Sequence, residues 1–555
     1  MMRSVMMLLI GCVLAIGQEI GARYLIVTHD NFYNAVQPLA QWKHKKGLRT
    51  KVVKLSEIGS SSYQIRNYVV NAYNSWQIPP DFLLLVGAPN YLPFTQIGYT
   101  YTDNYYTNVT GDIYNEILSG RLTVHNTTEA QTVVNKILAY ERTPNITDSL
   151  WFTSACLIAR LDWDSDDSIY WSDTYHAAGL MVNNGYTTID TLSNYYGHNT
   201  NHVLSAINNG RSILMYRGRG VNTWYSPFDV NADLSQNGTK LPIVLSLTCR
   251  TIGIGATPAT AEKWLLTGSP TLPRGGAGYF ATTTTVVGQA YLRSAVATGF
   301  FDAVFVDHKK TFGEACEAGR VRVYQMYLYQ GGGDEYYGFT TLGDPSMNLW
   351  TTCPKSIDVT HDTSLFVGDD TLNVHVEHAE MPVESAFVCI VLDSTIYETG
   401  YTDNSGGINF AITLPHQGDM DVTVTGTNLY PYEGTVTVIT GIEENQQQLS
   451  PYSSMPLLQV MPNPFFGKTM ISCVMDNPGS YYNYAELHIC DVTGARIKTY
   501  NITESVNEHS ENIYWSGLDE HDYQVPPGVY FVQLSLKMTA ESKKQTVTKK
   551  IIKLN

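Results

Sequence analysis

Short apolar runs alternate with segments of helical periodicity between residues 23 and 350. The run Asp81-Phe-Leu-Leu-Leu-Val-Gly87 is apolar at every inner position, as expected for a strand covered on both faces in a parallel sheet. Residues 62–76 instead repeat their apolar side chains every three or four positions, which predicts an amphipathic helix. The same two patterns predict further strands at 23–29, 51–55, 155–159, 186–190, 212–217, 242–248 and 277–283, and helices at 32–47, 174–184, 200–208, 260–267, 286–298 and 312–328. This alternation indicates an α/β domain with an open, mostly parallel sheet.

The pattern along the chain changes at three places. A polar break near 142–151 divides the α/β region into two subdomains. Helical periodicity ends near residue 350, and short strands with turns such as Asn404-Ser-Gly-Gly407 follow, as in an immunoglobulin-like sandwich. A glutamine-rich segment then precedes a second all-β region. The chain is therefore expected to contain subdomains over 23–150 and 151–352, an immunoglobulin-like domain over 353–440, a linker over 441–455 and a C-terminal β-sandwich over 456–555.

The first 22 residues have the composition of an export signal. A short basic start is followed by an apolar core over 5–17, and Gly17 or Ala22 could mark the cleavage point. This segment is too short to span a bilayer, and no other apolar run reaches the roughly 18 residues of a span. The net charge of −16 disfavours nucleic acid as a partner. We therefore expect a secreted or outer-surface protein without a transmembrane span.

Three predicted strands end next to side chains with reactive chemistry. Asp162 follows strand 155–159, Arg219 follows strand 212–217 and Cys249 follows strand 242–248. Because functional residues of open α/β sheets lie at the carboxyl ends of the strands, these three side chains are expected to converge. Each also has an interpretation without catalysis. Asp162 could belong to an acidic loop that is solvated or binds Ca²⁺, Arg219 could form a structural ion pair, and Cys249 could be a buried thiol.

Motifs in the first 350 residues resemble the gingipain family of cysteine peptidases. In chain order they are Tyr24-Leu-Ile-Val-Thr, Gly47-Leu48-Arg49-Thr50, Leu83-Leu-Leu-Val-Gly87, Gly120-Arg121, Tyr140-Glu141-Arg142, Tyr216 to Gly220, Leu241-Pro242 through Cys249, and Gly343-Asp344-Pro345-Ser346. The resemblance implies a caspase-like fold in two subdomains, followed by an immunoglobulin-like domain. It also implies cysteine-type endopeptidase activity on protein or peptide substrates.

The resemblance assigns roles to individual residues. Cys249 matches the nucleophile, and its backbone N–H and that of Gly220 would form the oxyanion hole. Asp162 falls where the family has an acidic residue that supports the catalytic dyad. Asp173 falls, by ungapped counting, where arginine-specific members have a substrate-pocket carboxylate. No cofactor is required, although family members bind Ca²⁺ and the acidic loop at 162–167 could hold this ion.

One position departs from the family, because Arg219 stands where the catalytic histidine is expected. A histidine accepts the thiol proton and then protonates the leaving amine, whereas an arginine does not give up its proton. Its guanidinium can still stabilise a nearby thiolate. His198 or His176 could substitute as the base. Three interpretations stay open: an endopeptidase with weakened activity, a catalytically dead pseudopeptidase that binds proteins or surface polymers, and a thiolate-based acyl transferase or esterase.

The C-terminal region carries a second resemblance, to the sorting domains of type IX secretion. The motifs are Met461-Pro-Asn-Pro-Phe465, Asp491-Val-Thr-Gly494 and Gly528-Val-Tyr-Phe531. They imply that secretion machinery is a partner and that the protein reaches the cell surface; a plain β-sandwich spacer is the alternative. Cys473 and Cys490 lie in neighbouring strand-like segments and either pair or remain two buried thiols.

Overall fold

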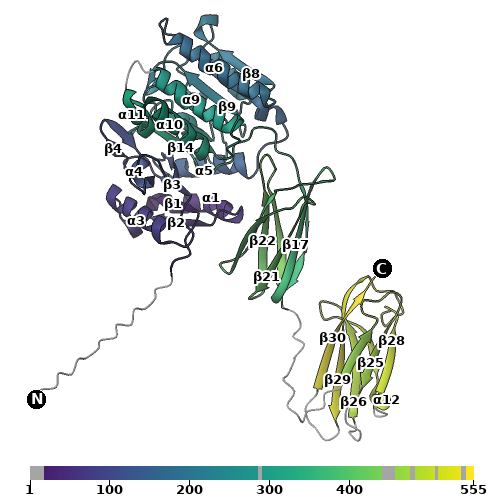
Figure 1. Cartoon of the computed structure of the whole chain (residues 1–555). Coiled ribbons are helices and arrows are strands. Elements are labelled where there is room, and N and C mark those ends of the chain that lie inside the picture. Colours follow the sequence, from purple (N-terminus) through teal and green to yellow (C-terminus); the bar gives the residue numbers. More distant parts are fainter. Residues whose placement is uncertain are drawn as a thin grey trace, which may run out of the picture. The chain divides into compact units, whose positions relative to one another are not determined.

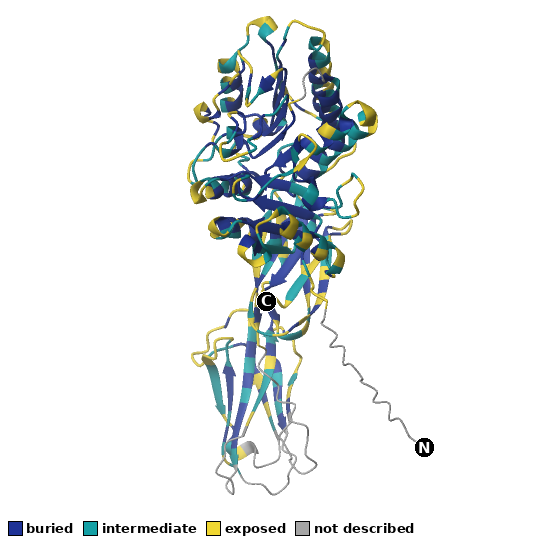
Figure 2. Cartoon of the chain, turned by 90° about the vertical axis from the view of Figure 1, so that its left-hand side faces the viewer, coloured by how far each residue is buried: buried dark blue, intermediate teal, exposed yellow. Residues whose placement is uncertain are grey.

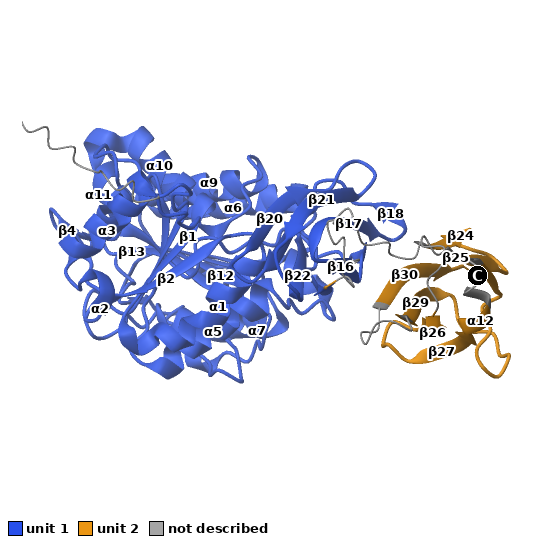
Figure 3. Cartoon of the chain, turned by 90° about the horizontal axis from the view of Figure 1, so that it is seen from below, with its two compact units in different colours: residues 1–439 blue, residues 440–555 orange. Residues whose placement is uncertain are grey.

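The computed structural model describes residues 18–285, 290–440, 457–474, 482–506, 510–538 and 545–554. These residues form two compact units, one up to residue 439 and one from residue 440 (Figure 3). Most of the expected export signal and the expected linker at 441–455 lie outside the described residues. Within the described part of the chain, no helix combines the length and apolar character needed to cross a membrane.

A ten-stranded sheet forms the centre of the first unit (Figure 1). β14 runs antiparallel to β13 and meets β6 through one residue pair, Leu342 with Arg121, while the remaining neighbours pair in parallel. The predicted open, mostly parallel α/β sheet is therefore confirmed. In spatial order the strands are β2 (Thr50–Lys54), β1 (Tyr24–Thr28), β3 (Phe82–Val86), β6 (Leu118–Leu122), β14 (Phe339–Leu342), β13 (Gly278–Thr282), β12 (Ile243–Leu247), β9 (Ile213–Arg217), β7 (Ser154–Ala159) and β8 (Thr188–Leu192).

Helices cover the sheet because its strands are apolar on both faces. In β1, Tyr24 and Ile26 belong to one hydrophobic cluster, while Leu25 and Val27 belong to another on the opposite face. Figure 2 shows these inner strands as buried and the outer helix faces as exposed. The longer helices are α1 (Tyr33–Lys45), α3 (Ser62–Ser75), α5 (Thr127–Glu141), α6 (Asp167–Asn183), α7 (Thr200–Asn209), α9 (Ala290–Phe305) and α10 (Phe312–Tyr327). Shorter elements are α2 (Leu55–Ile58), α4 (Asn104–Thr107), α8 (Lys263–Leu266), α11 (Gly332–Gly338), β4 (Thr95–Ile97), β5 (Thr100–Thr102), β10 (Gly220–Val221) and β11 (Thr223–Trp224).

The folded domain begins before Arg23. Gly21 forms a bridge with Ile78, and Trp76 Nε1 donates a hydrogen bond of 2.9 Å to Glu19. Gly21 has a φ of +80°, and a Cβ there would lie 2.5 Å from the Cβ of Trp76, so only glycine fits. Of the two expected cleavage points, Gly17 would leave these contacts intact, whereas cleavage at Ala22 would remove them.

The expected immunoglobulin-like domain is an all-β sandwich within the first unit. Alternate residues of β21 are buried, as expected when one face of a strand packs on a core. One sheet contains β15 (Asp358–His361), β17 (Gly368–His378), β18 (Met381–Pro382) and β21 (Gly407–Leu414); the other contains β16 (Ser364–Phe366), β23 (Tyr432–Ile439), β22 (Gly418–Thr425), β19 (Phe387–Leu392) and β20 (Ile396–Tyr401).

The immunoglobulin-like domain contacts the end of α1 directly. Lys45 and Asp421 form an ion pair of 2.8 Å, and the Tyr397 hydroxyl donates to the carbonyl of His44 at 3.1 Å. Gly47 lies so close to Phe387 that a Cβ would stand 2.2 Å from its ring. These contacts hold the two domains of the first unit together.

The second unit is a β-sandwich with its own core, as expected for the C-terminal region. Its buried side chains include Trp515, whose indole N–H donates to the carbonyl of Leu518 at 2.9 Å. Cys473 and Cys490 are both free, so the pairing considered from the sequence is not formed. The elements are β24 (Leu457–Met461), β25 (Thr469–Val474), β26 (Tyr482–Cys490), β27 (Arg496–Asn501), α12 (Thr503–Val506), β28 (Ser510–Trp515), β29 (Gly528–Met538) and β30 (Gln545–Lys553).

Candidate active site

The carboxyl ends of β7, β9 and β12 lie side by side at one edge of the sheet. Arg217, the last residue of β9, is in register with Leu247 of β12 and with Ala159 of β7. The loops that carry Asp162, Arg219 and Cys249 therefore leave the sheet at the same level. This arrangement follows from parallel pairing of three buried, apolar strands.

The three loops and two helices surround a small pocket of about 90 Å³. This volume suits one side chain or a small acyl group rather than a whole peptide. Cys249 and Arg219 both line the pocket. The other lining residues are Asp166, Tyr170, Arg217, Gly218, Gly220, Val221, Tyr225, Leu247, Thr248, Ala290 and Arg293.

Glycine at position 220 is required by the crowded turn after β9. A Cβ on Gly220 would lie 2.6 Å from the carbonyl oxygen of Thr223, closer than real Cβ contacts. The Thr248 hydroxyl donates to the carbonyl of Gly220 at 3.5 Å, which ties this turn to the segment before Cys249. Gly220 and Cys249 line the same pocket, as an oxyanion hole made from their backbone N–H groups would require.

The Cys249 sulfur accepts a hydrogen bond from a buried arginine that the sequence analysis did not single out. Arg293 Nη1 lies 3.4 Å from Cys249 Sγ, and Arg293 Nη2 lies 2.9 Å from Glu335 Oε1. Burial would lower the pKa of Arg293, but Glu335 and Cys249 raise it above its usual value. A guanidinium at this distance attracts negative charge that develops on the sulfur. The signal was visible as an arginine inside the mostly apolar sequence of α9, because a buried charge needs a partner.

Arg219 contacts carboxylates of the acidic loop. Its Nη2 donates to Asp164, and its Nε lies 3.5 Å from Asp162 Oδ2. Asp162 also accepts a hydrogen bond from Arg160. Burial raises the pKa of Asp162, although Arg160 and Arg219 act in the opposite direction. Asp162 thus contacts residue 219, as expected for the supporting acid of the family. In this chain residue 219 is an arginine, which keeps its positive charge.

Asp173 does not take the substrate-pocket position inferred for it. It is buried, accepts a hydrogen bond of 2.6 Å from Arg217 Nε and accepts another from the hydroxyl of Ser294 at 2.5 Å. Arg217, not Asp173, lines the pocket. The correction has a physical reason: the buried guanidinium of Arg217 needs a carboxylate, and Asp173 supplies it.

The two histidines considered as substitute bases also lie elsewhere. His176 is bonded to Asp302 at 2.8 Å, and His198 Nδ1 accepts the backbone N–H of Ser193 at 3.1 Å. Among the residues that the structure describes, no histidine lines the Cys249 pocket. Burial raises the pKa of Tyr170 to about 12, so this phenol keeps its proton at neutral pH. Among the described lining residues, Asp166 is therefore the carboxylate that could act as a base, and none is a histidine.

The acidic loop was also considered as a Ca²⁺ site. Asp162 and Asp164 contact arginines, and Asp167 accepts the backbone N–H groups of Asp162 and Trp163 at 2.8 and 2.9 Å. Over the described ranges, no group of three or more His, Cys, Asp or Glu residues is arranged to hold a metal ion. Ca²⁺ binding by this loop stays a prediction.

Comparisons with known proteins agree with this fold. Residues 18–350 match the model of peptidase family C25. The chain is 23% identical over 422 residues to gingipain R1 of Porphyromonas gingivalis, covering 73% of this chain and 41% of that protein. It is 24% identical over 453 residues to Lys-gingipain of the same species, covering 74% of this chain and 25% of that protein. The chain thus spans less than half the length of these two relatives.

A solved structure shows the same fold. It is the crystal structure of the Arg-specific cysteine proteinase gingipain R, with a TM-score of 0.68 and 21% identity over 76% of this chain and 99% of that one. The family match covers most of the α/β region, and the solved structure reproduces its architecture. The chain therefore belongs to peptidase family C25, the gingipain family of cysteine peptidases.

Proposed function

We propose that this protein is an exported member of the gingipain family that keeps Cys249 as a nucleophile beside Arg293 but has weak or absent peptide-bond hydrolysis. The observation that carries the proposal is the identity and bonding of Arg219. Where the family has its histidine, this chain has a guanidinium that contacts Asp162 and Asp164. The resulting protein would bind peptides, proteins or surface polymers at the edge of the former catalytic site.

The chemistry of amide cleavage explains the expected loss. A thiolate at Cys249 can add to a carbonyl carbon, and the backbone N–H groups of Gly220 and Cys249 can stabilise the resulting oxyanion. Collapse of this intermediate with C–N cleavage requires a proton on the leaving amine. Arg219 and Arg293 keep their protons, so neither can supply it. Loss of acid–base catalysis typically lowers a rate by about 10²–10⁴-fold, and esters or thioesters would be less affected because their leaving groups depart without prior protonation.

Exposed aromatic side chains beside the pocket support a binding role. Trp163 is 70% exposed and lies next to Asp162 and Asp164 in the acidic loop. Its ring centroid is 6.3 Å from that of Tyr195, which in turn is 5.0 Å from that of Tyr196. Trp163 also adopts a φ of 63°, a conformation that bulky residues rarely accept. A strained, exposed tryptophan at the edge of a pocket is characteristic of a contact surface.

The alternative is a working cysteine endopeptidase that uses a different base. Within the described lining, Asp166 is the carboxylate that such an enzyme would have to use. The contact between Cys249 and Arg293 supports this alternative, because a neighbouring guanidinium activates a cysteine nucleophile. Peptide hydrolysis that depends on Cys249 would establish it.

One experiment separates the two functions. The purified chain from residue 18 onward is incubated with a mixed fluorogenic peptide library and, separately, with iodoacetamide. Cys249→Ala, Arg219→His and Arg219→Lys are run in parallel, the last as a control that keeps the charge. We expect labelling of Cys249 without cleavage in the native chain, and cleavage only in Arg219→His. Cysteine-dependent cleavage by the native chain would refute the loss of peptidase activity.

The C-terminal unit is proposed to direct export through type IX secretion machinery, to the cell surface or the medium. Its support is the resemblance of its motifs and its separate core. The test is expression, in a bacterium that has this machinery, of the full chain and of a chain ending at residue 440. The full chain should appear outside the outer membrane and the shortened chain should not. Equal export of both would refute this role.

A further inference from the structure

A second and larger pocket lies between the α/β domain and the immunoglobulin-like domain, away from Cys249. Its volume is about 420 Å³, within the range of small-molecule sites. One of its lining residues, Thr311, precedes Phe312, whose ring lies against Gly278 at the first residue of β13. Cys249 instead follows the last residue of β12, the parallel neighbour of β13. The Cys249 pocket therefore lies at the carboxyl ends of these parallel strands, and the larger pocket lies at their amino ends.

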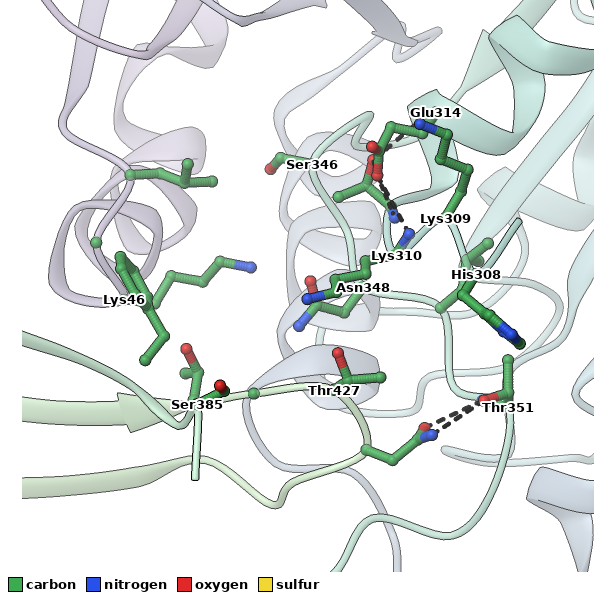
Figure 4. A pocket seen from close by; sticks show the side chains of 18 of the residues that line it. Lys46, His308, Lys309, Lys310, Glu314, Ser346, Asn348, Thr351, Ser385 and Thr427 are labelled. Carbon is green, nitrogen blue, oxygen red and sulfur yellow. Dashed lines mark hydrogen bonds between the residues drawn. The ribbon is translucent and has the colours of Figure 1, made fainter. Parts of the chain in front are cut away.

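The walls of this pocket come from segments that are far apart in the sequence. Lys46 comes from the end of α1, residues 308–311 precede α10, and Ser346 and Asn348 follow β14. Loops of the immunoglobulin-like domain close the other side with Ser385 and Thr427 (Figure 4). In Figure 4 the side chain of Lys46 points toward Asn348, and both contact Glu141: Lys46 Nζ lies 2.5 Å from Glu141 Oε1, and the backbone N–H of Asn348 donates to the same oxygen at 3.0 Å.

The two domains fix the shape of the pocket. The side chain of Asn428 donates to the hydroxyl of Thr351 at 3.0 Å, and the backbone N–H of Thr351 donates to the side chain of Asn428 at 3.2 Å. The ion pair of Lys45 with Asp421 lies at the same boundary. The cavity is thus formed in advance rather than created by a ligand, which lowers the entropic cost of binding.

Positive charge dominates the lining. Arg23, Lys46, Lys309 and Lys310 carry positive charge, and His308 adds an imidazole. Arg23 pairs with Asp81 and Lys46 with Glu141, both outside the lining, so Lys309 and Lys310 supply most of the positive field. Glu314 is the carboxylate in the lining, and it accepts the backbone N–H groups of Lys310 and Thr311 at the start of α10. The protein as a whole has a net charge of −16, so the charge of this pocket is opposite in sign to the overall charge of the protein. Low-dielectric walls strengthen such a field and attract anions.

Lys46 is the most deeply placed of these cations. Its Nζ lies 2.5 Å from Glu141 Oε1, and Glu141 also pairs with Lys43 at 2.6 Å. Lys43 also pairs with Asp344 at 2.5 Å, so two carboxylates neutralise the two buried ammonium groups. Burial lowers the pKa of Lys46 to about 8 despite its pair with Glu141. Lys46 therefore adds a hydrogen-bond donor to the wall of the pocket rather than an uncompensated charge.

Apolar surface lies beside the charged groups. Leu48, Phe82, Phe387 and Tyr401 contribute to the lining, and hydroxyl and amide groups come from Ser346, Ser385, Thr427 and Asn348. A bare inorganic ion would leave the apolar walls uncovered, and a neutral ligand would not balance the charges of Lys309 and Lys310. We propose that this pocket binds a small organic anion, with a carboxylate or phosphate group facing Lys309 and Lys310 and an apolar body against Phe82 and Phe387.

Calorimetry on the full chain from residue 18 onward tests the proposal with three probes. Phenyl phosphate presents both features, inorganic phosphate presents the charge alone, and benzyl alcohol presents the ring alone. We expect saturable binding of phenyl phosphate at one site, weaker binding of inorganic phosphate and none of benzyl alcohol. Absence of saturable phenyl phosphate binding, or equal binding of benzyl alcohol, would overturn the proposal.

Paired variants locate the binding. Lys309→Ala/Lys310→Ala removes two positive charges from the pocket, and both residues are exposed, so the fold should persist. Lys54→Ala/Lys263→Ala removes the same charge from sites outside the lining and serves as the control. The pocket variant should bind phenyl phosphate about tenfold more weakly or worse, while the control binds as the native chain does. Equal weakening in both variants would overturn the site, because it would reflect overall charge. Cys249→Ala should leave binding unchanged, which separates this site from the proposed function of the thiol.

Discussion

Replacing Arg293 should slow the reaction of Cys249 with alkylating reagents. The guanidinium lies 3.4 Å from the sulfur, and two opposite charges at that distance attract by about 5 kcal/mol at an effective dielectric constant of about 20. Glu335, 2.9 Å from the same guanidinium, offsets part of this attraction. A net effect on the order of 1–2 kcal/mol remains, which corresponds to roughly tenfold in the rate of alkylation.

The variant must avoid leaving a buried carboxylate alone. Arg293→Gln by itself would strand Glu335, which is 1% exposed, and would destabilise the protein for that reason. Arg293→Gln/Glu335→Gln removes both charges and keeps similar volumes. Arg293→Lys keeps the positive charge and is the matched control.

The assay is the rate of iodoacetamide alkylation at Cys249 between pH 6 and 9, followed by mass spectrometry of its peptide. Cys389, whose pKa burial raises to about 12, is an internal reference that should stay slow. We expect about tenfold slower alkylation in the double variant and near-native rates in Arg293→Lys. A double variant that reacts at the native rate across this range would refute an electrostatic role for Arg293.

Three further predictions follow from groups already described. Asp173→Asn should lower the free energy of unfolding by about 3–5 kcal/mol, because Arg217 keeps a buried charge without its carboxylate; denaturant titration measures this, and a change below about 1 kcal/mol would contradict it. Burial alone would raise the pKa of Glu141, but its two lysine partners lower it to about 2. This group therefore stabilises the fold above about pH 4.3, and the contribution is lost as the pH falls toward 2; melting temperatures at pH 3 and 5 should differ less in Glu141→Gln than in the native chain. Gly220→Ala should weaken the tetrahedral adduct of Cys249 with a peptide aldehyde on the order of 10²-fold, because the added Cβ displaces the turn; unchanged adduct formation would remove Gly220 from the oxyanion hole.

The sequence predicts most strands of the sheet, including β2 and β8, which carry polar residues. Two central strands, β6 and β14, were not expected. β6 has the sequence Leu-Ser-Gly-Arg-Leu, and its Arg121 is buried because Asp103 accepts two of its N–H groups at 2.6 and 2.9 Å. Such a partner, 18 residues away, cannot be recognised from local periodicity.

The same limit applies to the site. Cys249, Arg219 and Asp162 could be grouped in advance because each follows a strand, and parallel strands end together. Arg293 approaches the sulfur from a helix, and nothing in strand order places it there. Asp173 was misassigned because counting along the chain does not reveal that Arg217 must be neutralised inside the fold.

The place of β14 in the sheet sets the order in which the protein can be completed during synthesis. The strands from β1 to β6 and those from β7 to β13 are all made before β14, yet β14 lies between the two groups. Until residue 342 leaves the ribosome, β6 and β13 each present an open edge with unpaired backbone groups. Such edges invite pairing between chains, so the nascent protein is expected to need protection for as long as these edges remain open. A chain that stops before β14 should therefore aggregate rather than fold into two separate halves.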